Sequence, residues 1–130
     1  MSWQAYVDST LLGSGKVNAA AIFSAAGDSV WATSAGFAVM PEEIKLLATA
    51  FGDGSKVPEL PSPGFHIGGV KYITIKCEEK KIYGKQGKTG IVCARTTQAI
   101  LVAYYGEDIQ PGQAASTVEA LAEYLRGVGY

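Results

Sequence analysis

The sequence predicts an α+β fold, in which one antiparallel sheet of about six or seven strands packs against helices. Strand-like segments recur at regular spacing and are joined by short links, such as residues 78–80 and 96–98. Parallel strands need crossovers of about a dozen residues or more, so these links favour antiparallel neighbours. The run Ala99–Tyr105 is apolar on both alternating faces, which is typical of a central strand that is covered on both sides.

The N-terminal part is expected to form a helix followed by a β-hairpin. Ser2 can cap a helix that continues through Leu12 and stops at the glycines after it. The strand-like segments Ala19–Ser24 and Val30–Thr33 follow, and the residues Ala26-Gly27-Asp28 between them have the composition of a tight turn.

A second helix begins at Pro41, a good first-turn residue, and its apolar residues recur at helical spacing until Gly52. A short helical turn is expected over residues 58–63. The strands expected after it are Phe65–Ile67, Val70–Lys76, Lys81–Tyr83, Gly90–Arg95 and Ala99–Tyr105. Pro111 then opens the last helix, which carries one apolar stripe and ends at Gly127.

Length and composition fit a single domain over residues 1–130. A chain of 130 residues with 48% apolar and 18% charged residues can bury its own core and is not intrinsically disordered. The net charge of −1 argues against a nucleic-acid partner, because proteins that wrap nucleic acid are usually basic. The only cysteines are Cys77 and Cys93, and no signal peptide precedes the first helix, so a reducing compartment is expected.

No motif for catalysis or metal binding stands out in the sequence. The segment Gly84–Gly90 is similar to part of a phosphate loop, but GxxxxGK[ST] would need a glycine where Ile82 stands. A basic hairpin loop is the better interpretation. The single histidine, His66, has no acidic or cysteine partner at useful spacing, so we expect a structural role and no zinc. The adjacent acids Glu42-Glu43 and Glu78-Glu79 are interpreted as solvated charges.

Charge is distributed unevenly along the chain. Residues 71–95 carry a local net charge of +5, because this segment contains seven basic residues and only two acidic ones, Glu78 and Glu79. The basic residues are Lys71, Lys76, Lys80, Lys81, Lys85, Lys88 and Arg95. Lysine is common on exposed strand edges, where it discourages pairing with other chains. The alternative is an electrostatic footprint for an acidic protein surface or for anionic lipid headgroups, and the two interpretations carry equal weight.

Aromatic residues are concentrated at the two ends of the chain. Trp3 and Tyr6 lie one turn apart on the first helix, and Tyr124 and Tyr130 lie at the far end. These side chains either pin the terminal helices together or form an exposed aromatic groove. Such a groove suits proline-rich ligands, because a polyproline II helix is preformed and its carbonyls can accept hydrogen bonds from indole and phenol groups.

Several segments resemble those of one protein family. Residues 2–8 (SWQAYVD) are similar to the N-terminal signature of the profilins. The resemblance continues over the whole chain and is carried by Val30–Ala32, His66–Tyr72, Gly90–Thr96, Pro111–Gln113 and Glu123–Tyr130. The short length is similar to that of fungal and plant members.

The resemblance implies an actin-monomer-binding protein of the cytoplasm and cytoskeleton, without catalytic activity or a cofactor, that regulates polymerisation and delivers actin to barbed ends. It implies that the N- and C-terminal helices pack side by side on one face of the sheet, with shorter helices on the other. A separate groove would bind proline-rich segments of formins and related proteins. Phosphoinositide headgroups would compete with these ligands.

The resemblance also assigns residues to each site. The polyproline-binding positions fall on Trp3, Tyr6, Trp31, Tyr124 and Tyr130. The actin-binding positions fall on Lys71, Ile73, Lys76, Lys81, Lys85, Lys88, Gln110, Gly112, Gln113 and Ser116. The lipid-binding positions fall on Lys71, Lys80, Lys81, Lys85 and Lys88. Tyr124 stands where many animal members have histidine, and stacking should survive because the side chain is still aromatic.

Two other function classes stay open beside this one. A small-ligand sensor domain has a similar antiparallel-sheet architecture. It would need an internal cavity, and its terminal aromatics would serve packing alone. An enzyme would need an acid, base, nucleophile or metal constellation, and the sequence presents none.

Overall fold

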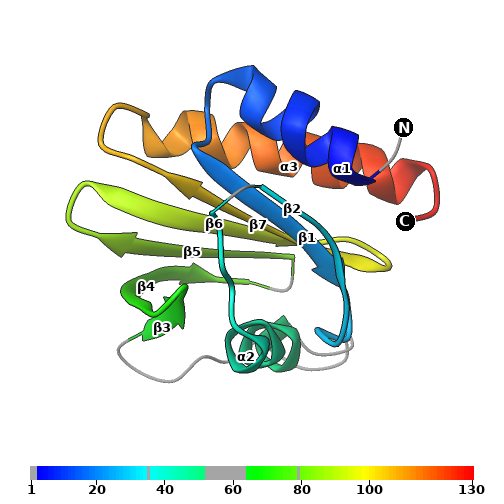
Figure 1. Ribbon diagram of the computed structural model, residues 1–130, viewed down its shortest axis with the longest axis horizontal. Coiled ribbons are helices and arrows are strands. Elements are labelled where there is room, and N and C mark those ends of the chain that lie inside the picture. The colour runs from blue at the N-terminus through cyan, green and yellow to red at the C-terminus, as the bar shows by residue number, and fades with distance from the viewer. Residues whose placement is uncertain (1–2, 35, 52–63, 79) are drawn as a thin grey trace.

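The computed structural model describes residues 3–34, 36–51, 64–78 and 80–130 (Figure 1). Its seven strands form one sheet in the order β2-β1-β7-β6-β5-β4-β3, and every pair of neighbours is antiparallel. The strands are β1 (Ala19–Ser24), β2 (Val30–Thr33), β3 (Gly64–Ile67), β4 (Val70–Cys77), β5 (Lys81–Gln86), β6 (Thr89–Arg95) and β7 (Ala99–Tyr105). The predicted α+β class and its antiparallel sheet are confirmed.

Helices cover both faces of the sheet. They are α1 (Trp3–Ala5), its continuations η1 (Tyr6–Leu11) and η2 (Leu12–Ser14), α2 (Pro41–Phe51) and α3 (Pro111–Gly127). The N-terminal helical segment lies beside α3 on one face, and α2 lies on the other (Figure 1). The side-by-side packing of the terminal helices is therefore confirmed. The helical turn expected over residues 58–63 lies outside the described residues.

The N-terminal helix changes its hydrogen-bonding pattern along its length. Its first turn is α-helical, η1 has wider π-helical turns, and η2 has tighter 3-10 turns that carry the helix to Ser14, beyond the predicted end at Leu12. Gly15 ends it with a φ of 74°, in the left-handed region that glycine adopts at little steric cost. Apolar periodicity predicts that a segment is helical, but it does not reveal a single wider turn. Ser2, the expected N-cap, lies outside the described residues.

Strand β7 carries the hydrophobic cores on both faces of the sheet. It lies between β1 and β6, and its side chains enter the two cores alternately. Leu101 and Ala103 pack with the terminal helices, whereas Ile100 and Val102 pack with α2. All four side chains are fully buried. This confirms that the doubly apolar segment is a central strand.

The segment similar to a phosphate loop is a hairpin turn. Gln86 of β5 pairs with Thr89 of β6 around Gly87 and Lys88. The φ of Gly87 is 59°, a value that suits the two-residue turns favoured between antiparallel strands. The segment joins two strands, as the interpretation as a basic hairpin loop predicted, and β5 continues beyond its predicted end at Tyr83.

Glu43 is buried, so the interpretation of Glu42-Glu43 as a solvated pair was wrong for this residue. Glu43 is 7% exposed. Its Oε1 accepts hydrogen bonds from the backbone N–H groups of Met40 at 2.8 Å and Gly68 at 2.7 Å. Its Oε2 accepts one from the N–H of Gly69 at 2.9 Å. One carboxylate thus ties the start of α2 to the turn of the β3–β4 hairpin, a contact between residues too distant in sequence for pattern analysis to reveal.

We expect Glu43→Ala to lower the free energy of unfolding by about 2–3 kcal/mol, because the three backbone N–H groups at 2.7–2.9 Å would lose a charged acceptor. Urea unfolding followed by circular dichroism measures the change. Glu42→Ala is the matched control, since it removes an exposed carboxylate from the same turn and should change the free energy by less than about 0.5 kcal/mol. Equal effects of the two substitutions would contradict the role given to Glu43.

Candidate binding surfaces

Aromatic side chains from distant parts of the chain form one cluster, the aromatic patch, which consists of Trp3, Tyr6, Trp31, Tyr124 and Tyr130. Trp3 lies at its centre, with its ring centroid 4.7 Å from that of Trp31 and 5.2 Å from that of Tyr130. The ring of Tyr6 lies 5.7 Å from Trp3 and 6.3 Å from Tyr124. The structure therefore brings together every residue that the resemblance assigned to polyproline binding.

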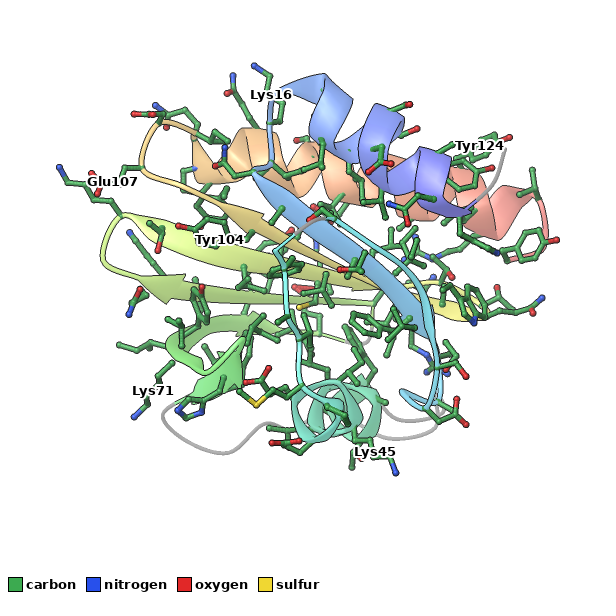
Figure 2. All side chains as sticks on the ribbon, in the orientation of Figure 1. Lys16, Lys45, Lys71, Tyr104, Glu107 and Tyr124 are labelled. Atoms are coloured by element: carbon green, nitrogen blue, oxygen red, sulfur yellow. The ribbon has the colours of Figure 1, made fainter. Side chains whose placement is uncertain are left out.

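The patch is both a packing element and an exposed surface. Trp3, Tyr6 and Trp31 are half-buried against the core under the terminal helices. Tyr124 and Tyr130 are 54% and 44% exposed, and Figure 2 shows Tyr124 at the side of α3 toward the N-terminal helix. The sequence left two interpretations open, packing or groove. The structure supports parts of both, because the inner rings join the helices to the sheet while the outer rings face solvent.

The chemistry of the patch combines flat apolar faces with hydrogen-bond donors. Burial, followed by the neighbouring Tyr124, raises the pKa of Tyr6 above its ordinary value. A hydrogen bond between the Tyr6 and Tyr124 phenols is a further cause of the raised pKa. Indole N–H groups are donors only. A ligand that suits this surface has apolar rings to stack and backbone carbonyls that lack an internal partner, as a polyproline II helix has.

A β-bulge places Lys76 of β4 on the face that carries α3. The pairing of β4 with β5 shifts by one residue between Thr74 and Lys76, so that Ile73 pairs with Lys85 and Lys76 pairs with Tyr83. Directly paired residues point to the same face of a sheet, and Tyr83 packs against the core under the terminal helices. Regular alternation from Ile73 would have sent Lys76 to the opposite face, so the extra residue is what places Lys76 beside Tyr83.

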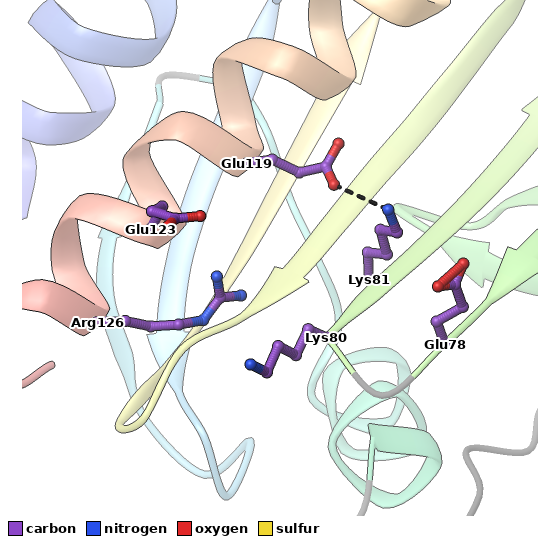
Figure 3. A pocket seen from close by; sticks show the side chains of 6 residues that line it. All are labelled: Glu78, Lys80, Lys81, Glu119, Glu123 and Arg126. Atoms are coloured by element: carbon purple, nitrogen blue, oxygen red, sulfur yellow. Dashed lines mark ion pairs between the residues drawn. The ribbon is translucent and has the colours of Figure 1, made fainter.

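Two of the predicted basic residues are paired within the chain. Lys81 Nζ lies 3.3 Å from Glu119 Oε1 on α3 (Figure 3), and the Tyr83 O–H donates a hydrogen bond to Glu119 Oε2 at 2.6 Å. Lys76 Nζ lies 3.3 Å from Glu78 Oε2 and 5.6 Å from the centroid of the Tyr83 ring. Burial, followed by the hydrogen bond to Glu119, raises the pKa of Tyr83, so its phenol stays protonated. These contacts neutralise part of the local positive charge.

Four of the other predicted basic residues face solvent, whereas Arg95 is half-buried. Lys71, Lys85 and Lys88 are exposed, and within the described residues no ion pair joins them to an acid. Lys80 is also exposed and lines an open, mostly charged pocket of about 320 Å³ between the strands and α3 (Figure 3). The accessible positive charge is therefore concentrated at β4, the β5–β6 turn and the start of β5.

An apolar cavity of about 230 Å³ lies between strands β4 to β7 and the start of α3. Its lining includes Ile75, Tyr83, Lys85 and Gly112. Ile75 is 60% exposed, and Ile73 nearby on β4 is 56% exposed. Large apolar side chains that are exposed close together commonly mark an interaction site. Ile75 and Tyr83 were missed from the sequence, although isoleucines on both sides of a threonine in an edge-proximal strand were an available signal.

The helix part of the predicted actin surface adjoins this cavity. Gln110, Gly112, Gln113 and Ser116 lie exposed at the start of α3, and Gly112 lines the cavity itself. The structure therefore brings Lys85 of the predicted strand part and Gly112 of the predicted helix part to one apolar cavity, whereas Lys71, Lys76 and Lys81 do not line it. We call this the basic–apolar face, which consists of Ile73, Ile75, Lys85, Lys88 and residues 110–116.

Sites of other kinds are not found in the described part of the chain. The described residues contain no group of three or more histidine, cysteine or acidic side chains placed to hold a metal ion. His66 is exposed on β3. Cys93 is a free, fully buried thiol whose pKa is raised by burial, which makes it unreactive. None of the described helices has the length and apolar character needed to cross a membrane.

Comparison with known proteins identifies close relatives. A family model described as "Profilin" matches residues 1–130. Profilin of Schizosaccharomyces pombe is 55% identical over 130 residues, with 100% of both chains covered. Profilin-2 of Acanthamoeba castellanii is 48% identical with the same coverage. The crystallised S. pombe profilin has a TM-score of 0.93 with this chain, covering 99% of this chain and 100% of that one.

More distant solved structures share the fold. Mouse profilin IIa, solved in complex with a double repeat from the FH1 domain of mDia1, has a TM-score of 0.78 at 23% identity, with 100% of both chains covered. LokiProfilin2, solved in complex with rabbit actin, has a TM-score of 0.74 at 18% identity and covers 92% of each chain. At these identities the similarity is one of fold.

The 4.7 Å separation of the two indole rings predicts exciton coupling in the circular dichroism spectrum of the native protein. Because Trp3 and Trp31 are the only tryptophans, Trp31→Phe should abolish the coupled bands and preserve the signal from helices and strands. Tyr104→Phe, which removes a phenol outside the patch, is the control and should leave the bands unchanged. Coupled bands that persist in Trp31→Phe would contradict the geometry of the patch.

Proposed function

This chain belongs to the profilin family, and we propose that it binds monomeric actin through the basic–apolar face and proline-rich segments of formin-type proteins through the aromatic patch. Binding actin would let it regulate polymerisation and deliver monomers to barbed ends. The family assignment supports a binding protein rather than an enzyme. Such a role corresponds to a place in the cytoplasm, at the cytoskeleton.

The single observation that carries the proposal is the aromatic patch. Trp3 contacts three other rings at centroid distances of 4.7–5.7 Å, yet the outer rings remain about half exposed. A cluster of rigid aromatic faces at the surface loses little side-chain entropy when a ligand stacks on it. Mouse profilin IIa, whose complex holds an FH1 repeat, has the same fold, which supports a proline-rich ligand here.

The actin half of the proposal is supported by the composition of the basic–apolar face. Interface centres are commonly apolar and the surrounding charges steer association. Here Ile73 and Ile75 are exposed beside Lys85, and the start of α3 lies across the cavity. LokiProfilin2, whose complex holds rabbit actin, has the same fold. The two proposed sites are separate, because one lies at the Pro111 end of α3 and the other at the Tyr124 end.

We extend the proposal to phosphoinositide headgroups at the lysines assigned by the resemblance. These residues are Lys71, Lys80, Lys81, Lys85 and Lys88. Lys81 is paired with Glu119, so the other four are the better candidates for phosphate contacts. Because Lys85 also belongs to the basic–apolar face, headgroups and actin would compete for it.

For the aromatic patch, we expect a proline decamer to change the intrinsic tryptophan fluorescence, since both tryptophans lie in the patch. Trp31→Ala should raise the Kd by about tenfold or more, because an aromatic anchor in contact with Trp3 is lost. Lys85→Glu is the control and should leave this Kd unchanged. If the wild-type protein shows neither a fluorescence change nor retention on a polyproline column, the polyproline proposal is rejected.

For the actin half, Lys85→Glu should raise the apparent Kd for monomeric actin by about threefold to tenfold, because it reverses a charge beside the proposed interface. Suppression of nucleation in pyrene-actin assembly measures this effect. Lys45→Glu makes the same charge change at an exposed position on α2, on the other side of the sheet (Figure 2), and should have no effect.

Two results would count against the actin proposal. Unchanged nucleation at saturating wild-type protein would reject actin binding itself. Equal losses in Lys85→Glu and Lys45→Glu would show that the effect follows net charge, and would remove the basic–apolar face as the site.

A further inference from the structure

We infer that the turn between β6 and β7 (residues 96–98) positions Tyr130 in the aromatic patch, so that Thr96 and Gln98 set the affinity of the patch through Tyr130. The inference rests on the proposed polyproline function and adds residues that neither the resemblance nor the sequence patterns assigned. Thr96 and Gln98 are therefore positioning residues.

The C-terminal segment reverses direction to bring Tyr130 back to the patch. After α3 ends at Gly127, Gly129 adopts a φ of 94°, which favours glycine strongly. The backbone N–H of Tyr130 then donates a hydrogen bond to the Leu125 carbonyl at 2.8 Å. The Tyr130 ring meets the Trp3 ring edge-on, with an angle of 88° between their planes. Terminal residues tend to fray unless they are tied down, so this placement needs a restraint.

The turn supplies that restraint through side-chain and backbone hydrogen bonds. Thr96 Oγ1 donates to the Tyr130 backbone oxygen at 2.6 Å. The backbone N–H of Gln98 donates to the same oxygen, and Gln98 Nε2 donates to the Gly129 carbonyl at 2.9 Å. We call this set of contacts the C-terminal latch. Its donors come from the short link between the central strands β6 and β7, which the hydrogen bond from the Thr96 N–H to the Ala99 carbonyl at 2.8 Å closes.

Thr96 is well suited to a positioning role and unsuited to ligand contact. It is 4% exposed, so a bound peptide cannot reach its side chain. Its hydroxyl accepts a hydrogen bond from the backbone N–H of Ala99 at 3.0 Å. Of the two acceptors within reach of its proton, the Tyr130 oxygen at 2.6 Å is closer than the Ala99 carbonyl at 3.3 Å. The last helical turn is tied to the same region, because the Arg126 guanidinium donates to the Arg95 carbonyl at 2.7 Å.

The latch controls how often the patch is complete in the free protein. Tyr130 is 44% exposed, so packing alone restrains it weakly. If the latch opens, only a fraction of molecules presents Tyr130 beside Trp3. The apparent Kd for a ligand that needs this ring rises in inverse proportion to that fraction.

The test combines ligand affinity with a measurement that needs no ligand. The affinity is the Kd for a proline decamer from tryptophan fluorescence, and the second readout is the rate at which carboxypeptidase A releases Tyr130. Thr96→Val removes the hydroxyl at nearly constant shape, whereas Thr96→Ser keeps it. Gln98→Ala removes an exposed donor, and Thr97→Ala is its matched control in the same turn.

We expect Thr96→Val and Gln98→Ala to raise both the Kd and the release rate by about threefold to tenfold, the change that one lost hydrogen bond of ordinary strength produces. Thr96→Ser and Thr97→Ala should stay within about twofold of wild type on the same scale. If Thr96→Val does not fold, Gln98→Ala decides the question, because its side chain is exposed.

The inference is overturned if the wild-type protein binds the decamer and Gln98→Ala releases Tyr130 faster with an unchanged Kd. It is also overturned if Gln98→Ala raises the Kd without faster release of Tyr130, because the turn would then affect ligand binding without positioning Tyr130. If the wild-type protein does not bind the decamer, the proposed polyproline function itself is rejected. This outcome is distinguishable from the two above, because those concern the variants of a protein that binds.

Discussion

Packing of the two chain ends against the same face of the sheet is the constraint on which both candidate surfaces depend. Val7 and Leu11 of the N-terminal helix share one core with Val118 and Leu125 of α3, and all four are fully buried. This packing leaves the aromatic rings of both ends side by side. It also fixes the opposite end of α3 over the strands that carry the lysines. A helix of 17 residues spans about 25 Å, so one rigid element separates the two surfaces.

Local patterns predicted the elements of this fold well, because each pattern is decided by nearest neighbours along the chain. The bounds of α2 and α3 follow from prolines at their first turns and from apolar stripes, and β7 follows from its continuous apolar run. The resemblance predicted the members of the aromatic patch. Patterns failed where a distant partner decides the outcome. Glu43 is charged and adjacent to another acid, yet it is buried because the Gly68-Gly69 turn presents N–H groups to it.

The bulge in β4 is the second feature that local patterns could not reveal. If the side chains of β4 alternated regularly between the two faces, Lys76 would lie on the α2 side of the sheet. The shifted register places it with Tyr83 on the other side. Counting charges along the sequence also misses contacts with distant residues. A local excess of +5 along the chain includes Lys76 and Lys81, whose partners are fixed by the tertiary structure. The accessible charge is therefore smaller and more localised than composition suggests.

The buried carboxylate of Glu43 also bears on how the protein loses its structure. It joins α2, a helix near the middle of the chain, to the hairpin at the far edge of the sheet. Apolar packing of Phe65, Ile67 and Tyr72 with α2 also joins the two elements, and an edge hairpin that opened in isolation would expose unpaired strand edges to other chains. Tied in this way, the hairpin and the helix must open together as one cooperative unit. Their amide hydrogens should then share one exchange protection level, distinct from that of the layer formed by the chain ends.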